Sequence, residues 1–259
     1  MVNSNDDRIK DLNREVHVYI AFVSKYVNSG QRAWYERLLA EEEYRKYSKL
    51  HFSKDRDIYL TAHVLLRVVL SKYAHVPPEA WAFTSNRFGR PEILSREEGA
   101  ASLRFSLSRT RGMAVCGIAR SMEIGVDVEE VRPLNDLETL SNHVLTEGEQ
   151  SWLRRRAEHE RLESFFQLWT LKEAYLKAKG VGLSQPLNEV GFDLDGEEPP
   201  RLGPAGKCFD QAADWQFLTT QPAPSHRMAV ALRTEGTGER QIRISEEAPA
   251  EYRGEGSKP

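Results

Sequence analysis

The chain has 259 residues, with 36 Lys and Arg against 39 Asp and Glu, which gives a net charge of −3. Hydrophobic residues make up 40% and charged residues 29%, a composition that excludes disordered and fibrous chains. Because the balance is slightly acidic, the chain offers no general attraction to nucleic acid, and we expect no nucleic-acid partner.

Several other classes of protein are also disfavoured. Cys116 and Cys208 form no CxxC pair, which argues against a zinc module and against a disulfide framework. No apolar run approaches the roughly 18 residues that a transmembrane helix needs. The polar, acidic start and the short apolar stretch at residues 16–23 do not fit a signal peptide. We therefore expect a cytoplasmic protein that does not contact membranes.

The first half of the chain predicts strands around one long helix. Residues 16–23 are rich in β-branched and aromatic side chains, as strands are. Residues 31–50 are charged and helical, and from about 55 to 73 apolar residues recur every three or four positions, which predicts a helix with one buried stripe. Residues 103–108 and 113–119 again resemble strands, and residues 85–101 are expected to form a loop.

The second half repeats this pattern. Residues 124–129 predict a strand, and the spacing of Thr146 and Glu149 predicts a capping box that opens a helix. A strong helix is expected over 165–179, ending at Gly180. Short strands are expected at 190–194, 215–219 and 228–233, and the Gly-, Glu- and Arg-rich segment after Thr234 is expected to be a frayed tail.

Each half thus contains strands, a long apolar helix and more strands, which predicts a duplicated α+β fold in which each half is a small antiparallel sheet packed with a long helix. The expected boundaries are an N-terminal lobe at 1–118, a C-terminal lobe at 119–233 and a flexible tail at 234–259.

Acidic residues alternate on the strand at 124–129. Asp127 and Glu129 are two positions apart, so both carboxylates leave the same face, where Gly125 also lies. Two converging carboxylates suit Mg²⁺, which prefers a few oxygen ligands together with substrate phosphates. A solvated strand face gives the same alternation, and the pair by itself favours that interpretation.

The helix at 165–179 carries a second group of charged residues. Glu173 and Lys177 are four positions apart, with Lys172 one position off that line. They are either an exposed salt bridge worth about 0.3–0.5 kcal/mol or part of a site, because the opposite face is densely aromatic and must be buried.

Taken together, the two segments resemble a known family. Ile124-Gly125-Val126-Asp127-Val128-Glu129 and Trp169-Thr170-Leu171-Lys172-Glu173-Ala174-Tyr175-Leu176-Lys177 are similar to the two-part signature of 4′-phosphopantetheinyl transferases. The spacing and length resemble the surfactin-synthetase-activating class, whose single chain folds as two similar subdomains related by a pseudo-twofold axis. The resemblance extends over residues 15–233 and includes Phe88-Gly89-Arg90-Pro91, Phe105-Ser106-Leu107-Ser108 and Lys179-Gly180-Val181-Gly182-Leu183.

The resemblance implies transfer of 4′-phosphopantetheine from coenzyme A to a serine of an apo acyl or peptidyl carrier protein, with release of adenosine 3′,5′-bisphosphate. It places Asp127, Glu129 and Glu173 on the family's Mg²⁺ positions. It also implies that Glu173 accepts the proton of the serine hydroxyl, directly or through a water. Lys177 would contact the pyrophosphate and assist the leaving group. We infer a monomer from the duplicated length.

Further contacts with coenzyme A follow from the same resemblance. The candidates are Arg90 in the Gly89–Pro91 turn, the Ser108–Arg109 pair, Lys172 beside the catalytic helix positions, and Lys54 or Arg56 for the 3′-phosphate. Coenzyme A would lie between the halves. The basic run Arg154–Arg156, together with the Gly180 turn, is a candidate surface for the acidic carrier, although such a run is more often a solvated helix face.

This sequence departs from the family at two positions, with Ser106 in place of Asn and Arg109 in place of His. Arginine is a permanent cation that can hold a phosphate at any pH, so coenzyme A binding is expected to survive. Arg109 motivates one rival, a weak or inactive protein that binds coenzyme A or the carrier. A second rival is a Mg²⁺-dependent hydrolase of the coenzyme A pyrophosphate.

Overall fold

The computed structural model describes residues 5–94, 97, 99–194, 200–203 and 210–249. The N-terminal part contains α1 (Asn5–Asp11), β1 (Glu15–Phe22), α2 (Val23–Val27), α3 (Arg32–Leu38), α4 (Glu41–Ser48), α5 (Ser53–Leu70), β2 (Phe83–Ser85), β3 (Pro91–Ile93), β4 (Leu103–Thr110) and β5 (Met113–Arg120). The remainder contains β6 (Ile124–Glu130), α6 (Leu137–Val144), α7 (Glu147–Arg154), α8 (Glu158–Lys179), β7 (Phe192–Asp193), β8 (Arg201–Leu202), β9 (Trp215–Thr220), β10 (His226–Arg233) and β11 (Gln241–Glu246).

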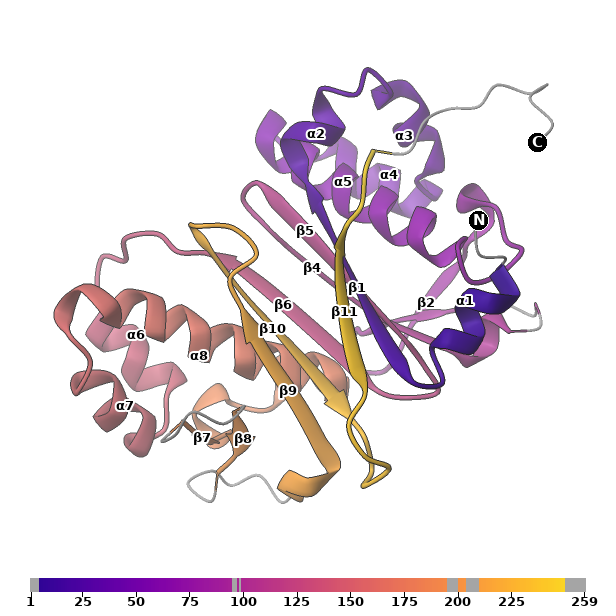
Figure 1. The fold of residues 1–259 in the computed structure, drawn as a ribbon. Coiled ribbons are helices and arrows are strands. Elements are labelled where there is room, and N and C mark those ends of the chain that lie inside the picture. Colours follow the sequence, from indigo (N-terminus) through magenta and orange to yellow (C-terminus); the bar gives the residue numbers. More distant parts are fainter. Residues whose placement is uncertain (1–4, 95–96, 98, 195–199, 204–209, 250–259) are drawn as a thin grey trace.

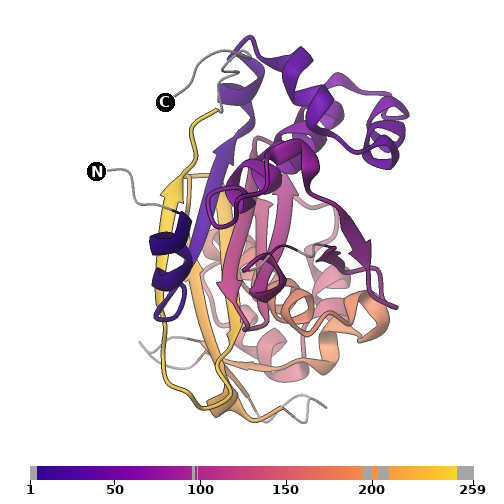
Figure 2. The same ribbon diagram turned by 90° about the vertical axis from the view of Figure 1, so that its right-hand side faces the viewer.

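Two β-sheets form the centre of the molecule, and a long helix covers the outer face of each. The N-terminal sheet has the order β11-β1-β5-β4, and the C-terminal sheet has the order β6-β10-β9. Helix α5 packs on the first sheet and α8 on the second (Figures 1 and 2). The expected α+β fold of two similar lobes, each a small sheet with one long helix, is confirmed.

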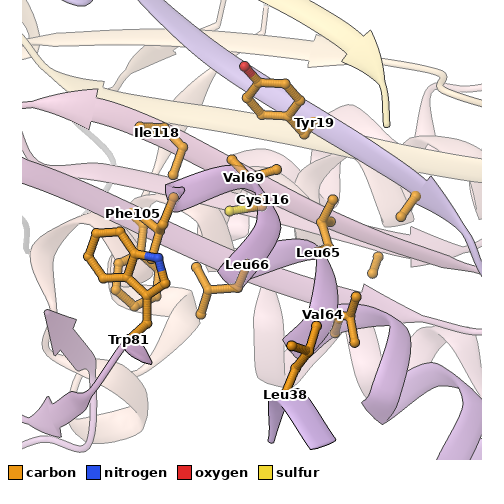
Figure 3. Packing of buried hydrophobic residues seen from close by; sticks show 14 of the residues in the cluster. Tyr19, Leu38, Val64, Leu65, Leu66, Val69, Trp81, Phe105, Cys116 and Ile118 are labelled. Atoms are coloured by element: carbon orange, nitrogen blue, oxygen red, sulfur yellow. The ribbon is translucent and has the colours of Figure 1, made fainter. Parts of the chain in front are cut away.

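The core of the N-terminal lobe lies between α5 and its sheet. Leu65, Leu66 and Val69 of α5 lie toward Phe105, Cys116 and Ile118 of the strands, while Val64 lies beside Leu38 of α3 (Figure 3). Their three- and four-residue spacing gives α5 a continuous apolar face, as the sequence predicted. Cys116 is fully buried and reduced, so it packs as a small hydrophobic residue. Cys208 lies outside the described residues.

A second core joins the two lobes. Alternate residues of β1, β5, β6 and β10 turn their side chains from one sheet toward the other. They are Val16, Val18 and Ile20 of β1; Met113, Val115 and Ala119 of β5; Ile124, Val126 and Val128 of β6; and Met228, Val230 and Leu232 of β10. A Cβ atom at Gly117 would lie 2.7 Å from Val126 Cγ1. Glycine at this position therefore lets the sheets approach each other.

The regular elements fall close to the predicted ranges, except that the loop expected at 85–101 contains strand β3, which pairs with β2, and that two elements of the C-terminal lobe differ. Helix α8 begins at Glu158, well before the expected residue 165, and the strand expected at 190–194 is only β7, Phe192–Asp193. The capping box is confirmed, because Glu149 N donates to Thr146 Oγ1 and Thr146 N donates to Glu149 Oε2. In the described part of the chain, no helix is both long and apolar enough to cross a membrane.

The prediction of a frayed tail after Thr234 is wrong for β11. This strand pairs in parallel with β1, from Glu15 opposite Gln241 to Ile20 opposite Glu246. Arg243 Nη2 donates to Glu15 Oε1 at 2.6 Å, which adds an ion pair to the ladder. The C-terminal segment thus returns to the N-terminal lobe, while the expected lobe boundary at 118 falls inside β5.

Candidate active site

A glycine on β6 determines how closely α8 approaches the sheet. A Cβ atom at Gly125 would lie 1.8 Å from the carbonyl oxygen of Ala174 and 2.6 Å from the amide nitrogen of Ala178. Any larger residue would therefore push α8 away from β6. Asp127 and Glu129 share this face of β6, so the close approach brings them next to the charged residues of α8.

Asp127 is the centre of a polar group that joins the two lobes. Its Oδ1 atom accepts hydrogen bonds from Lys177 Nζ at 2.6 Å and from Ser108 Oγ at 2.8 Å. Lys177 also donates to Ser108 Oγ at 2.9 Å. Asp127 is only 4% exposed, and its Oδ2 atom is buried with no hydrogen-bond partner in the described structure.

Two more carboxylates lie around Asp127. Burial first, and then the charge of Asp127, raise the pKa of Glu129 to about 7, while a hydrogen bond from Thr110 Oγ1 at 3.1 Å opposes the shift. Burial and Asp127 also raise the pKa of Glu173, while Lys177 lowers it. One ammonium group therefore does not fully compensate the acidic charge collected here.

The donor set can be tested for a divalent cation. No three His, Cys, Asp or Glu side chains among the described residues are grouped closely enough to form a metal site as they stand. However, a buried carboxylate oxygen without a partner, Asp127 Oδ2, lies beside two carboxylates whose pKa its charge raises. Hard oxygen donors with excess negative charge are what Mg²⁺ requires, so these residues fit such an ion.

The turn at residues 86–90 connects the N-terminal lobe to the end of α8. Asn86 Nδ2 donates to the carbonyl oxygen of Gly180 at 3.0 Å, and Arg90 Nη1 donates to that of Ala178 at 3.0 Å. Arg90 also pairs with Glu123. Gly180 ends the helix with φ +66°, and a Cβ there would lie 3.0 Å from Arg90 Cδ. The left-handed glycine and the close approach explain the abrupt helix end.

A cavity of about 220 Å³ opens between these segments. Phe88 to Pro91 and residues 105–107 line it from the N-terminal lobe, and Lys177, Gly180 and Gly182 line it from the C-terminal lobe. Because Lys177 both lines this cavity and binds Asp127, the polar group adjoins the cavity.

This chain is similar in sequence to known proteins. A model of the 4′-phosphopantetheinyl transferase superfamily matches residues 123–232, which include the three carboxylates and Lys177. The 4′-phosphopantetheinyl transferase HetI of Nostoc sp. is 31% identical over 75% of this chain and 78% of its own length. This chain belongs to the 4′-phosphopantetheinyl transferase superfamily. The 4′-phosphopantetheinyl transferase Sfp of Bacillus subtilis is 24% identical over 82% of this chain and 90% of its own length, and the resemblance inferred from the motifs is confirmed.

Solved structures of the superfamily align with part of the chain. The holo-[acyl-carrier-protein] synthase of Thermotoga maritima is 24% identical, with a TM-score of 0.37, over 44% of this chain and 64% of its own. A holo-(acyl-carrier-protein) synthase from Bacillus anthracis, in complex with coenzyme A (3′,5′-ADP), is 19% identical, with a TM-score of 0.37, over 44% of this chain and 98% of its own.

Lys172 does not belong to the site, which corrects the prediction that it contacts the coenzyme. Its ammonium is fully buried and pairs with Glu149 Oε2 at 2.6 Å. It also donates to the carbonyl oxygens of Leu187 at 3.0 Å and Val190 at 2.5 Å. Since a helix turns by about 100° per residue, Lys172 lies on a different face from Lys177 and holds the C-terminal lobe together.

The other predicted basic residues lie on the N-terminal lobe, and their role toward coenzyme A stays a prediction. The Arg109 guanidinium lies over the Tyr59 ring of α5, 5.3 Å from its centroid. Arg56 donates to the carbonyl oxygen of Leu50 at 2.9 Å, and Lys54 lies over the Phe52 ring at 5.5 Å. Since neighbouring strand residues face opposite sides, Ser108 reaches Asp127 while Arg109 turns toward α5.

Three residues that sequence reasoning missed also shape the site. Thr110 donates to Glu129, Asn86 fixes the turn at the end of α8, and Glu123 pairs with Arg90. One signal was present in the sequence: Ser106, Ser108 and Thr110 alternate on β4 just as Gly125, Asp127 and Glu129 alternate on β6.

Proposed function

We propose that the polar group around Asp127 and the adjoining cavity form the active site of a Mg²⁺-dependent 4′-phosphopantetheinyl transferase. The enzyme would transfer 4′-phosphopantetheine from coenzyme A to a serine of an apo acyl or peptidyl carrier protein and release adenosine 3′,5′-bisphosphate. The observation that carries the proposal is the position of Lys177, which binds Asp127 and Ser108 across the lobes and lines the cavity at the same time.

Coenzyme A would lie at the cavity between the lobes. Its pyrophosphate is an anion and requires cations, and Lys177 is a cation that lines the cavity and binds Asp127. Arg90 lines the other side, where its pairing with Glu123 and the carbonyl of Ala178 holds its guanidinium in place. In this proposal the N-terminal lobe, through Ser108, Arg109 and either Lys54 or Arg56, completes the contacts to the nucleotide.

Asp127, Glu129 and Glu173 would hold Mg²⁺, with the unpartnered Oδ2 of Asp127 as the first ligand atom. When bound, the ion would neutralise charge on the phosphate oxygens of coenzyme A. The protein's own contribution is positioning and electrostatics, because the reaction needs little covalent help from the enzyme.

Glu173 is the proposed acceptor of the serine proton. As the serine Oγ–phosphorus bond forms and the bond to the departing nucleotide phosphate breaks, the hydroxyl proton would pass to Glu173, directly or through a water. A carboxylate whose pKa is raised toward neutrality is a better base at neutral pH than an ordinary one. Lys177 would stabilise the departing phosphate.

The test is a labelling reaction with coenzyme A, Mg²⁺ and an apo carrier protein, followed by mass spectrometry of the intact carrier. We expect the carrier to gain one phosphopantetheine, and a second measurement should find an equal amount of adenosine 3′,5′-bisphosphate.

The two rival functions give different products in the same reaction. An unmodified carrier that nevertheless binds the protein would show an inactive binding protein. Free phosphopantetheine formed equally well without carrier would show a pyrophosphohydrolase.

Three finer points belong to the same proposal. We propose that the protein is cytoplasmic. We also propose that it is a monomer, because the two lobes supply both sides of the site within one chain. The basic run Arg154–Arg156 at the end of α7 is the proposed docking surface for an acidic carrier helix. Size-exclusion chromatography with light scattering tests the monomer, and reversing these charges should raise the KM for the carrier but not for coenzyme A.

A further inference from the structure

Three hydroxyl side chains of β4 connect the edge of the N-terminal sheet to the edge of the C-terminal sheet. Ser106 Oγ accepts from Val126 N at 3.0 Å, Ser108 Oγ from Val128 N at 3.3 Å, and Thr110 Oγ1 from Glu130 N at 3.2 Å. The register is constant, since each hydroxyl binds the amide 20 residues further along the chain. We name these three residues the hydroxyl ladder.

The hydroxyl ladder supplies hydrogen-bond acceptors to the edge of β6. Strands β4 and β6 are edge strands of different sheets and form no backbone pairing with each other. The amides of Val126 and Val128 are buried at this edge, and a buried amide without an acceptor is costly. The side-chain oxygens supply the acceptors that a neighbouring strand would otherwise provide.

Two residues of the hydroxyl ladder also donate hydrogen bonds to carboxylates. Ser108 donates its proton to Asp127 Oδ1 at 2.8 Å, and Thr110 donates to Glu129 Oε2 at 3.1 Å. The register is again constant, with the carboxylate 19 residues after the hydroxyl. At the corresponding position from Ser106 the chain has Gly125, which carries no side chain. Ser106 therefore makes the backbone bond alone.

We infer that Ser108 and Thr110 are positioning residues that orient the carboxylates of Asp127 and Glu129 for a divalent cation, while Ser106 only joins the lobes. The inference rests on the proposed function, since it needs those carboxylates to be metal ligands. A hydroxyl that both accepts from the backbone and donates to a carboxylate leaves that carboxylate few rotamers, and such outer partners tune metal affinity. The lobe-to-lobe register thereby sets the geometry of the metal site.

Thr110 gives the cleaner test, because Ser108 also contacts Lys177. Thr110→Val keeps the shape but removes both hydrogen bonds, and Thr110→Ser restores the hydroxyl. Ser106→Ala is the matched control, because it removes the same kind of backbone bond without touching a carboxylate. The measurement is binding of Mn²⁺ to the full chain without coenzyme A, because Ser106 lines the cavity proposed for the coenzyme. Binding is followed by electron paramagnetic resonance, with thermal melting of each variant alongside.

We expect Thr110→Val to weaken Mn²⁺ binding by about 10- to 100-fold, the usual effect of losing an outer partner of a metal ligand. Thr110→Ser should restore the affinity. Ser106→Ala should lower the melting temperature about as much as Thr110→Val does, yet leave the Mn²⁺ affinity at the wild-type value. In a Glu129→Gln background, Thr110→Val should cause no further loss, because its effect passes through Glu129.

Equal Mn²⁺ affinity of Thr110→Val and wild type would overturn the inference, as would an equal loss of affinity in Ser106→Ala. A wild-type protein that binds no Mn²⁺ would overturn it as well. Failure of the proposed function is seen separately, because the carrier-labelling reaction of the wild-type protein decides that function without reference to these variants.

Discussion

Helix α8 carries two lysines that each pair with a carboxylate at 2.6 Å, yet the two pairs differ in every other respect. Lys172 is fully buried, and its ammonium has three acceptors, which are Glu149 and the carbonyl oxygens of Leu187 and Val190. Lys177 is 30% exposed at a cavity, and the carboxylate that it binds, Asp127, keeps one buried oxygen without a partner.

The difference separates a structural ion pair from the one proposed to act in the active site. Glu149 also accepts from the amides of Thr146 and Phe192, so the Lys172 pair is saturated by protein atoms. The Asp127 group has unused acceptor capacity and two neighbouring carboxylates with raised pKa values. A site that must bind a metal and a polyanion needs such unsatisfied capacity, whereas a packed lobe cannot tolerate it.

Removing the saturated pair should have the largest effect, and on stability. Lys172→Met leaves the buried Glu149 without its cation, so we expect the free energy of unfolding to fall by about 3–5 kcal/mol. Urea denaturation measures this loss. The double variant Lys172→Met/Glu149→Gln should recover part of the lost stability. If its loss instead equalled the sum of the losses of the two single variants, the two side chains would not be coupled.

Removing the unsaturated pair should affect the rate instead. Lys177→Met is expected to reduce carrier labelling by about 10²- to 10³-fold, as the loss of one preorganised charge usually does. Its free energy of unfolding should fall less than that of Lys172→Met, because the Lys177 ammonium is partly exposed to water and Asp127 keeps its hydrogen bond from Ser108. If the stability loss instead matched that of Lys172→Met, the distinction between the two pairs would be lost.

Glu173, one turn before Lys177 on the same helix, gives a related prediction. Glu173→Gln keeps the size of the side chain but can neither accept the serine proton nor supply a charged ligand. We expect transfer to fall by at least about 10²-fold, while coenzyme A binding, measured by calorimetry, falls far less. Turnover near the wild-type rate would remove Glu173 from the mechanism.

The excess charge around Asp127 should also appear in the pH dependence of stability. The pKa of Glu129 rises from 4.5 to about 7 on folding, so between these values the folded state holds a proton that the unfolded chain has released. Raising the pH through this window should therefore lower stability. In EDTA, the melting temperature of the wild type should fall more than that of Glu129→Gln between about pH 5 and about pH 8. Parallel curves would show that Glu129 is not perturbed.

The smallest effect is expected at Arg109, outside both ion pairs. Its guanidinium lies over Tyr59 rather than on Asp127. We expect Arg109→His to label the carrier at least as fast as the wild type. The measurements are the labelling rate and the KM for coenzyme A. Complete loss of activity would mean that Arg109 has a role that histidine cannot fill.

The fold and the position of the site were largely predictable from local patterns. The apolar spacing of α5, the alternation on β6 and the glycine that ends α8 each act within a few residues, so the sequence shows them directly. Strand β11 was missed because Ile242 and Ile244 alternate only briefly in a charged segment, and parallel pairing with β1 is a long-range contact.

The role of each lysine was less predictable than its place on the helix. Lys172 and Lys177 look alike in sequence, and only the tertiary contacts with Glu149 and Asp127 distinguish them. The hydroxyl ladder was hidden for the same reason: Ser106, Ser108 and Thr110 gain meaning only when β4 lies against β6.

A crystal structure with coenzyme A and Mn²⁺ tests the central claim most directly, because the anomalous signal locates the metal independently of the protein. We expect one Mn²⁺ bound by Asp127 Oδ2 and by at least one of Glu129 and Glu173, with the pyrophosphate between it and Lys177. Coenzyme A bound elsewhere on the protein, or Mn²⁺ on residues other than these three, would contradict the account.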